Sequence, residues 1–370
     1  MQNKISIIGY YPYPTSVGGI SVQIKRIGLF LKEYNIPYII YAIGDKTGKI
    51  DSNILVFNKK RWWKIFFRLP FDSSKVIHSH FIFIMPMHIL MYFLKIFNKK
   101  IILSIHIEGL EIKLKKMPKI LRILIIYFLK KYDCIIADGE HIKTQLLNIG
   151  INNSKIKVIF PYIRPILSDE ERNIVPKQIY NLLEKSNFKI IANGQIDIFK
   201  NHRDAYGVDM LIELTKQLKK KKYDIVLLYA LLFKDNQTKE EKKYYSELRQ
   251  KIKEYNVEKY FYFYEVTNSE FWPLLEKADL FLRPTSTDTY GVSIAEALSF
   301  GIPSIASDVC PRPNGTILFK NRDLDDFVSK TIDVINNYEQ YREKIKNLEI
   351  EDNFTKILKV YQDLCNYGKV

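Results

Sequence analysis

The sequence predicts two doubly wound α/β domains that face each other across a cleft. Strand-like and helix-like stretches alternate along most of the 370 residues, which is typical of parallel sheets covered by helices on both faces. The length suits two domains of roughly 150 residues each. A proline-flanked linker is expected at residues 160–165. We therefore expect domains at residues 1–165 and 166–350, and a C-terminal helix at 351–370 that can pack back on the first domain.

In the first half, short apolar runs alternate with a helical pattern. The helix is expected at residues 19–34, because apolar residues recur there at helical spacing. The expected strands are residues 4–9, 36–42, 76–77, 101–106 and 134–137.

The second half repeats this alternation. The expected strands are residues 188–193, 224–229, 260–265, 280–283 and 303–307, and the expected helices are residues 206–219, 239–255, 271–277 and 291–300. In sheets of this kind the ligand lies at the carboxyl ends of the strands, where the connecting loops begin.

The composition excludes several classes of protein. With 47% hydrophobic and 26% charged residues, the chain is neither disordered, collagen-like nor a coiled coil. Its three cysteines have no metal-ligand spacing and cannot all pair, which indicates a reducing compartment. The apolar runs at 81–94 and 120–129 are shorter than the roughly 20 residues of a membrane-spanning helix, so we expect both to be buried core segments. Residues 1–10 read as a strand and not as a signal peptide.

The net charge of +16 is carried by the first half alone. Residues 1–165 hold 26 Lys and Arg against 9 Asp and Glu, whereas the remainder is almost neutral. Such asymmetry indicates an anionic partner for the first half.

Two segments of that half combine cations with aromatic and aliphatic residues, at 58–68 and 111–131. This mixture is typical of elements that lie on an anionic membrane surface. The alternatives are a solvated charged face and a lysine bias of the whole genome. Such a bias would not spare the second half. No nucleic-acid-binding motif is present, so nucleic acid is not an expected partner.

A glycine pair follows the first expected strand and opens the first helix. At Gly18 and Gly19 the free backbone N–H groups of a helix N-terminus would be accessible to a phosphate. A tight turn without a ligand is an equally good interpretation of a bare Gly-Gly pair.

The most informative stretch is residues 283–307, RPTSTDTYGVSIAEALSFGIPSIAS. It predicts a strand end at Arg283, a small polar loop, and a helix from about Tyr290 to Phe300 whose start Asp288 or Thr289 can cap. Free N–H groups near its start form a second candidate phosphate site. Glu296 follows Asp288 by eight positions, roughly 12 Å at helical rise. That is too far for a hydrolytic pair of carboxylates at about 5–9.5 Å, but it suits two carboxylates at opposite ends of a diphosphate.

This stretch resembles the E-x-x-x-x-x-x-x-E region of retaining glycosyltransferases of the GT-B fold, in glycosyltransferase family 4 and its relatives. The form RPT…TDxYGxSxAEA is similar to enzymes of bacterial surface-polysaccharide assembly. Further matches follow in order along the chain, namely Gly18-Gly19-Ile20, His78-x-His80, Ser104-x-His106, residues 132–137 and residues 206–211. The resemblance covers most of the chain.

Three positions depart from the family pattern. The first glutamate of the motif is Asp288, and the usual cations of the diphosphate site are replaced by Gln195 and Tyr206. The longer loop between these two positions contains Lys200, His202 and Arg203, which can substitute for them; a solvated loop is the alternative.

The resemblance implies a cytoplasmic hexosyltransferase, peripheral at the inner face of the cell membrane. It implies a nucleotide-diphosphate-sugar donor, a glycan or lipid-linked acceptor, and neither a cofactor nor a metal ion. The resemblance implies that His106 lies near the reacting centre. A buried core histidine is the alternative interpretation at a strand end. The implied catalytic residues are His106, Asp288 and Glu296, and the implied donor-binding residues are Gly18, Gly19, Gly194, Gln195, Lys200, Arg203, Val266, Tyr290, Gly291, Val292 and Glu296.

Two other functions fit the sequence. A nucleotide-sugar 2-epimerase would pair the same kinds of domain but would need carboxylates for proton transfer. A non-catalytic protein that binds membranes or polyanions on a degenerate transferase scaffold would explain the replacements Gln195 and Tyr206.

Overall fold

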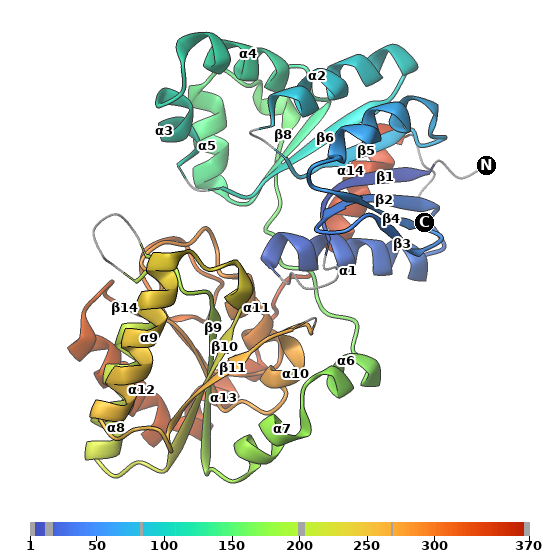
Figure 1. The fold of residues 1–370 in the computed structure, drawn as a ribbon. Coiled ribbons are helices and arrows are strands. Elements are labelled where there is room, and N and C mark those ends of the chain that lie inside the picture. Colours follow the sequence, from blue (N-terminus) through green and yellow to red (C-terminus); the bar gives the residue numbers. More distant parts are fainter. Residues whose placement is uncertain are drawn as a thin grey trace. The chain divides into compact units, whose positions relative to one another are not determined.

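The computed structural model describes residues 4–11, 18–81, 84–107, 109–198, 204–267 and 269–365 (Figure 1). The chain divides into two compact units. The first unit comprises Met1–Ile166 and Asp352–Val370, and the second comprises Leu167–Glu351. The expected linker at 160–165 lies just before the first crossing between the units.

The first unit contains an eight-stranded sheet in the order β3-β4-β2-β1-β5-β6-β7-β8. Only β3 runs antiparallel to its neighbour; the other described pairings are parallel. The chain order reverses between β1 and β5, so the loops after these two strands flank the switch point at which such sheets bind ligands. The strands are β1 (Ile5–Tyr10), β2 (Tyr38–Gly44), β3 (Gly48–Asp51), β4 (Ile54–Asn58), β5 (Val76–Ser79), β6 (Lys100–Ile105), β7 (Cys134–Ala137) and β8 (Ile156–Val158).

Helices cover both faces of this sheet (Figure 1). One face carries two short 3₁₀ helices, η1 (Trp62–Phe67) and η2 (Leu69–Phe71), and the α-helices α2 to α5. The opposite face carries α1 and α14, so the end of the chain packs in the first unit. The bounds are α1 (Gly19–Glu33), α2 (Met85–Leu94), η3 (Lys95–Phe97), α3 (Leu110–Lys115), α4 (Lys119–Leu129), α5 (Glu140–Asn148), η4 (Asn153–Lys155) and α14 (Phe354–Cys365).

The second unit contains a six-stranded parallel sheet in the order β11-β10-β9-β12-β13-β14. Here the order reverses between β9 and β12, and the loops after these strands flank the switch point. The strands are β9 (Phe188–Gly194), β10 (Ile225–Leu231), β11 (Phe261–Glu265), β12 (Leu280–Arg283), β13 (Ser304–Ser307) and β14 (Ile317–Phe319).

Both faces of the second sheet are also covered. Helices α8, α9 and α12 pack on one face, and α7, α10 and α11 on the other. The bounds are α6 (Asp169–Ile174), α7 (Lys177–Glu184), α8 (Val208–Lys220), η5 (Lys234–Asn236), α9 (Lys239–Glu254), α10 (Trp272–Leu275), α11 (Val292–Ser299), α12 (Leu324–Asn336) and α13 (Tyr338–Lys346). The prediction of two doubly wound α/β units is therefore confirmed.

One prediction about the core is wrong in part. The apolar runs at 81–94 and 120–129 were expected to be buried, but their helices α2 and α4 each bury one side and expose the other. In each run, apolar residues occur around more of the helix than the one side that packs on the sheet. The remaining apolar residues therefore face outward.

Candidate functional site

The candidate site of the second unit is built from the loops that follow β9 and β12 at the switch point. These loops are joined to each other: Ser286 donates its backbone N–H to the Ala205 carbonyl at 2.8 Å and its hydroxyl to the Asp204 carbonyl at 2.9 Å. Gly207, at φ +69°, lets the start of α8 approach the carbonyl of Pro284, because a Cβ there would lie 2.1 Å from that oxygen. The two loops form one surface as a result.

Two arginines meet on the carboxylate of Asp288. Arg283, the last residue of β12, donates from Nε to Asp288 Oδ2 at 3.1 Å. Arg312, in the loop after β13, donates from Nη1 to the same oxygen at 2.7 Å. Arg312 is fixed further by Ser307 and Thr285, and its side chain is only 1% exposed. This Arg-Asp-Arg cluster places two guanidinium groups beside the carboxyl ends of β12 and β13.

The cluster sets the charge of Asp288. Burial by itself raises the pKa of this carboxyl, but the guanidinium groups of Arg283 and Arg312 outweigh burial and lower the pKa to about 2. Asp288 is consequently an anion at neutral pH. Both of its oxygens have partners within the chain, since Oδ1 accepts the Thr289 N–H at 3.0 Å.

The expected cap of the following helix is wrong. The helix starts at Val292 and not at Tyr290, and its N-cap residue is Gly291, with no side-chain cap from Asp288 or Thr289. Gly291 has φ +92°, and a Cβ there would lie 2.5 Å from Ile294 Cδ1 and 3.1 Å from Arg312 Nη1. The helix start thus lies against the cluster through a residue without a side chain.

Arg283 also lies beside the positions that lack the usual cations. It donates from Nη1 to the Asn193 carbonyl and to Asn193 Oδ1, both at 3.1 Å, and its guanidinium lies 5.2 Å from the centre of the Tyr206 ring. Gly194 follows Asn193, and a Cβ there would lie 2.2 Å from Tyr206 Cδ1. Gln195 is next, with its carbonyl accepting the Tyr229 hydroxyl at 3.3 Å. A guanidinium group therefore lies next to Tyr206, where the sequence lacks a cation.

A carboxylate occupies the start of α8. Asp204 Oδ1 accepts the N–H groups of Tyr206 and Gly207 at 2.9 Å, and its Oδ2 accepts the Tyr244 hydroxyl at 3.2 Å. Burial, together with nearby Asp209, raises the pKa of Asp204 to about 6. The N-terminus of α8 is therefore satisfied by this chain's own side chain. The predicted substitutes Lys200 and Arg203 lie outside the described residues.

The other predicted residues of this unit are spread over its strand ends. Glu296 lies in the second turn of α11 and is 4% exposed. Tyr290 is half-buried, and burial, followed by the charge of Glu351, raises its pKa to about 12. Val292 is half-buried at the start of α11, while Val266 follows β11 at the far edge of the sheet from β12.

The first unit gathers three histidines where β5 and β6 end. His106 follows β6, its Nδ1 lies 2.8 Å from Asp138 Oδ2, and its Nε2 lies 2.8 Å from Nδ1 of His80. The rings of His80 and His106 are nearly parallel, with centres 5.1 Å apart. Since Asp138 Oδ2 accepts a hydrogen bond from Nδ1–H of His106, the other ring nitrogen of His106 is directed to His80. In the part of the chain that the structure describes, His80 Nε2 has no hydrogen-bond partner.

His78 belongs to the same group. Its Nε2 lies 2.7 Å from the Ser104 hydroxyl, and its Nδ1 lies 2.7 Å from the hydroxyl of Tyr361 in α14. Residues two apart along a strand project from the same face, and the rings of His78 and His80 are accordingly neighbours with centres 4.3 Å apart. Burial lowers the pKa of His78 to about 3 and that of His80 well below its usual value.

The predicted glycine pair begins α1. Gly18 is the N-cap in extended conformation, and the first turn contains neither an acidic residue nor a side-chain cap. A Cβ on Gly19 would meet no atom within 4 Å, so this helix start has open space around it. It lies after β1, next to the switch point of its sheet.

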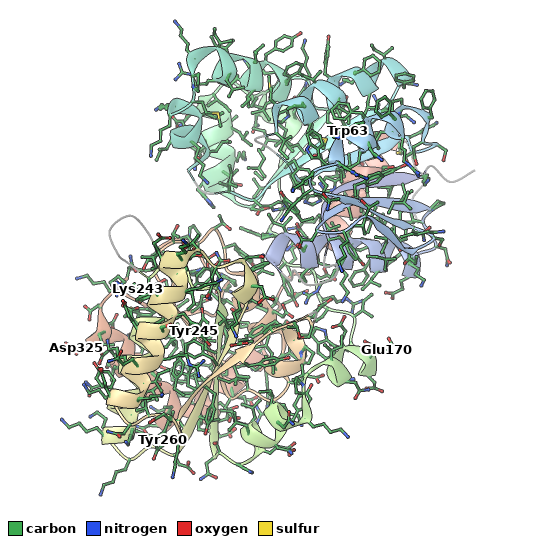
Figure 2. All side chains as sticks on the ribbon, in the orientation of Figure 1. Trp63, Glu170, Lys243, Tyr245, Tyr260 and Asp325 are labelled. Atoms are coloured by element: carbon green, nitrogen blue, oxygen red, sulfur yellow. The ribbon has the colours of Figure 1, made fainter. Side chains whose placement is uncertain are left out.

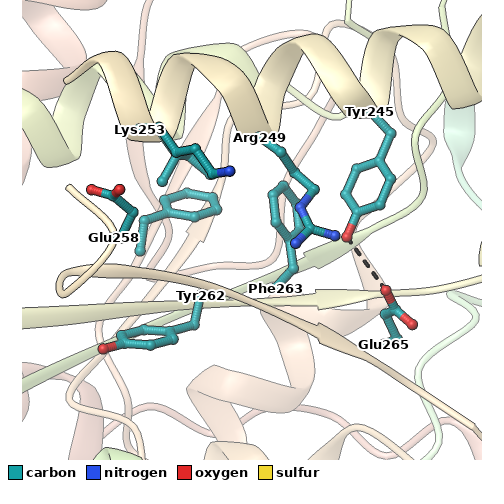
Figure 3. Close-up of a pocket in the computed structure, with 9 residues that line it drawn as sticks. Tyr245, Arg249, Lys253, Glu258, Tyr262, Phe263 and Glu265 are labelled. Atoms are coloured by element: carbon teal, nitrogen blue, oxygen red, sulfur yellow. Dashed lines mark hydrogen bonds between the residues drawn. The ribbon is translucent and has the colours of Figure 1, made fainter. Parts of the chain in front are cut away.

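A hollow lies between α9 and the edge strand β11 (Figure 3). Its volume is about 320 Å³, and Tyr245, Arg249 and Phe263 line it together with Glu265, whose Oε1 accepts the Tyr245 hydroxyl at 3.5 Å. None of the predicted site residues lines it. No group of three His, Cys, Asp or Glu side chains within the described ranges is arranged to hold a metal ion.

Several residues of these clusters were not singled out from the sequence, among them Arg312, Asp138, Asp204 and Tyr361. Arg312 comes 24 residues after Asp288, and its only local signal is its place between Pro311 and Pro313. Asp138 follows the strand that resembles the family pattern, and its position directly after a buried strand was the available signal.

Comparison with known proteins identifies the class of the second unit. Residues 185–351 match the family model "Glycosyl transferases group 1". The second unit is therefore similar to group 1 glycosyl transferases. A curated protein of Klebsiella pneumoniae, "Uncharacterized 41.2 kDa protein in cps region", is 26% identical over 249 residues, which are 66% of this chain and 63% of that protein. The chain thus matches somewhat less than two thirds of this relative's length.

Solved structures share the fold over nearly the whole chain. Anabaena Alr3699/HepE in complex with UDP-glucose has a TM-score of 0.67 at 14% identity and covers 98% of each chain. A glycosyltransferase from Rickettsia africae has a TM-score of 0.69 at 14% identity, covering 99% of this chain and 100% of that one. Trehalose-6-phosphate synthase OtsA has a TM-score of 0.71 at 12% identity, with the same coverage. The chain has the GT-B fold.

Proposed function

We propose that this chain is a retaining hexosyltransferase of family 4 type. It transfers a sugar from a nucleotide-diphosphate donor to a glycan or lipid-linked acceptor in the synthesis of a cell-surface polysaccharide. The observation that carries the proposal is the Arg283-Asp288-Arg312 cluster at the switch point of a unit that matches group 1 glycosyltransferases. The UDP-glucose complex of a protein with the same fold and the cps region of the Klebsiella relative support the donor class and the pathway.

The chemistry requires stabilisation of the departing diphosphate. When the bond between the sugar and the diphosphate breaks, negative charge grows on the leaving oxygen, and fixed cations and N–H groups lower the barrier. Arg283 and the backbone N–H groups at the start of α11 are the groups proposed for this role. Asp288 holds both guanidinium groups in place, which favours a positioning role for this carboxylate over the catalytic role that the resemblance implies.

The remaining roles rest on the resemblance and, for His106, also on its hydrogen bond to Asp138. Glu296 is the carboxylate of α11 proposed to bind the ribose hydroxyls. His106, oriented through Nδ1 by Asp138, is proposed to act near the reacting centre. The acceptor attacks from the face that the nucleotide leaves, so the configuration of the sugar is retained.

The proposed location is cytoplasmic, at the inner face of the cell membrane. None of the described helices is long and apolar enough to cross a bilayer. The proposed association is therefore peripheral, and the excess of cations in residues 1–165 supports it.

The test is a thermal-shift screen with UDP-, GDP- and ADP-sugars, followed by product analysis. A ligand at 100 times its Kd stabilises the native state by about 2.7 kcal/mol, so one base should raise Tm by several degrees. Incubation of the donor with a polysaccharide-derived acceptor should then give a product whose anomeric configuration, measured by NMR, is unchanged. The variant Glu296→Gln should lose turnover, while its melting profile in the absence of ligand should equal that of the wild type. Failure of all three nucleotides to bind, or an epimer formed from donor alone, would refute the proposal.

A further inference from the structure

The helical layer formed by η1, η2, α2, η3 and α4 in the first unit exposes large apolar side chains. Phe71 is 85% exposed, and Ile96 and Ile120 are each 75% exposed. Soluble surfaces usually carry such residues singly, whereas here they recur on every element of the layer. Trp63 lies in the same layer (Figure 2).

Ring contacts join these elements into one surface. The rings of Phe71 in η2 and Phe97 in η3 have centres 6.5 Å apart, and Phe97 also contacts Phe93 of α2 at 5.5 Å. Tyr92 of α2 contacts Tyr127 of α4 at 6.3 Å. These ring contacts connect η2, η3, α2 and α4. We call the exposed apolar side chains of the layer, together with the cations of the same segment, the apolar-basic face; its apolar residues include Trp63, Phe71, Phe93, Ile96, Ile120 and Ile123.

The charge of this segment has one sign. Residues 54–131 contain 16 Lys and Arg against only three acidic residues. The Asp72 carboxylate is buried, where it pairs with Lys4 and accepts a hydrogen bond from the Tyr41 hydroxyl. Glu111 forms an ion pair with Lys115. The charges of these two acids are therefore already balanced within the chain. Exposed lysines occur in the same segment, among them Lys64 in η1, Lys113 in α3, and Lys116 and Lys119 around the start of α4.

We propose that the apolar-basic face docks on an anionic lipid bilayer. Apolar rings and aliphatic chains gain free energy when they enter the boundary between headgroups and acyl chains, while lysines reach outward to the lipid phosphates. Each Lys or Arg near an anionic surface adds about 1 kcal/mol of attraction, equal to about fivefold in affinity. A second copy of this chain would bring the same positive face against itself. A nucleic acid would use the cations but leave the apolar side chains in water.

The experiment is vesicle co-sedimentation of the full chain with two matched pairs of variants. The charge variant is Lys113→Gln, Lys116→Gln and Lys119→Gln, and its control is Lys239→Gln, Lys242→Gln and Lys243→Gln on exposed positions of α9 in the second unit. The apolar variant is Phe71→Ser, Ile96→Ser and Ile120→Ser, and its control is Leu167→Ser, Ile174→Ser and Leu318→Ser, which are exposed in the second unit. All changes are at the surface, and circular dichroism melts check that each variant folds.

The wild type and both controls should bind vesicles that contain phosphatidylglycerol, and bind vesicles of phosphatidylcholine alone much more weakly. The charge variant should bind on the order of 100-fold more weakly at low salt, with a shallower salt dependence. The apolar variant should lose binding in a manner that salt does not change. Equal binding by the folded variants and the wild type would overturn the proposal. An equal loss of binding in the control variants, or a dimer in light scattering that the apolar variant abolishes, would also overturn it. This inference rests on the peripheral association included in the proposed function. Nucleotide-sugar binding and transfer are measured separately, so a failure of membrane docking is distinguishable from a failure of sugar transfer.

Discussion

At the scale of the residue, Arg283 is the side chain that connects the parts of the candidate site in the second unit. Its guanidinium links Asn193 at the end of β9, Asp288 in the next loop and the face of Tyr206. Family patterns place cations at the positions of Gln195 and Tyr206, and this chain presents an arginine from the neighbouring strand instead. A cation can thus be kept at a site although its position in the sequence changes.

We expect Arg283→Gln to weaken binding of the nucleoside diphosphate by about 10- to 100-fold, because a charge-assisted hydrogen bond contributes about 1.5–3 kcal/mol. Binding of the nucleoside alone should change little. Isothermal titration calorimetry of both ligands measures the difference, with Arg249→Gln in the α9–β11 hollow as the control. An equal loss for nucleoside and diphosphate would indicate a general structural defect and not a phosphate contact.

At the scale of the element, α14 is the segment whose place depends most on distant partners. Phe354 stacks on Phe30 of α1 with ring centres 4.8 Å apart, and Tyr361 is fully buried against His78. The final helix follows the second unit in sequence, yet it completes the core of the first.

We expect Phe354→Ala to lower the free energy of unfolding of the first unit by about 3–5 kcal/mol, the usual cost of removing a buried aromatic ring. Denaturant unfolding followed by circular dichroism measures the change. Leu318→Ala, at an exposed position of β14, should cost less than about 0.5 kcal/mol. Similar losses in the two variants would contradict the packing of α14 in this core.

The buried histidines give this unit a predicted pH dependence. Burial lowers the pKa of His78 to about 3, below the roughly 6.5 of an unfolded histidine. The folded unit therefore binds fewer protons than the unfolded chain between these values. Its stability is complete above about pH 6.5 and falls as the pH decreases toward 3.

Melting temperatures measured from pH 7 to 4 should show this decline. The double variant His78→Gln and His80→Gln should have a lower melting temperature at pH 7, and its melting temperature should fall less between pH 7 and 4. The control is His141→Gln in α5. An unchanged slope in the double variant would assign the acid sensitivity to other groups.

At the scale of the whole molecule, two units with separate cores are joined by two crossings of the chain. The residues proposed to bind the donor are concentrated in the second unit. We expect calorimetric scans to contain two transitions, of which the nucleotide diphosphate raises mainly one. Phe354→Ala should lower the other. If that variant and the nucleotide act on the same single transition, the two units unfold cooperatively.

The sequence predicted the elements that carry the candidate site with small errors at their ends. The strands at 134–137 and 280–283 have the predicted bounds, because β-branched and apolar residues there are flanked by clear turn residues. The start of α11 was misplaced by two residues, because Asp288 has the chemistry of a cap but forms ion pairs with two arginines instead. Local sequence cannot show a competing partner 24 residues away.

The sequence by itself determined the α/β class, the two-unit organisation and the stretch at 283–307, since periodicity, glycine placement and local motifs depend on neighbours along the chain. Only the tertiary structure decided that Arg312 joins Arg283 on Asp288, that His78 meets Tyr361, and that α2 and α4 leave half of their apolar surface exposed. These outcomes depend on which strand ends and helix faces meet in space, and on how much apolar surface one layer of helices can cover.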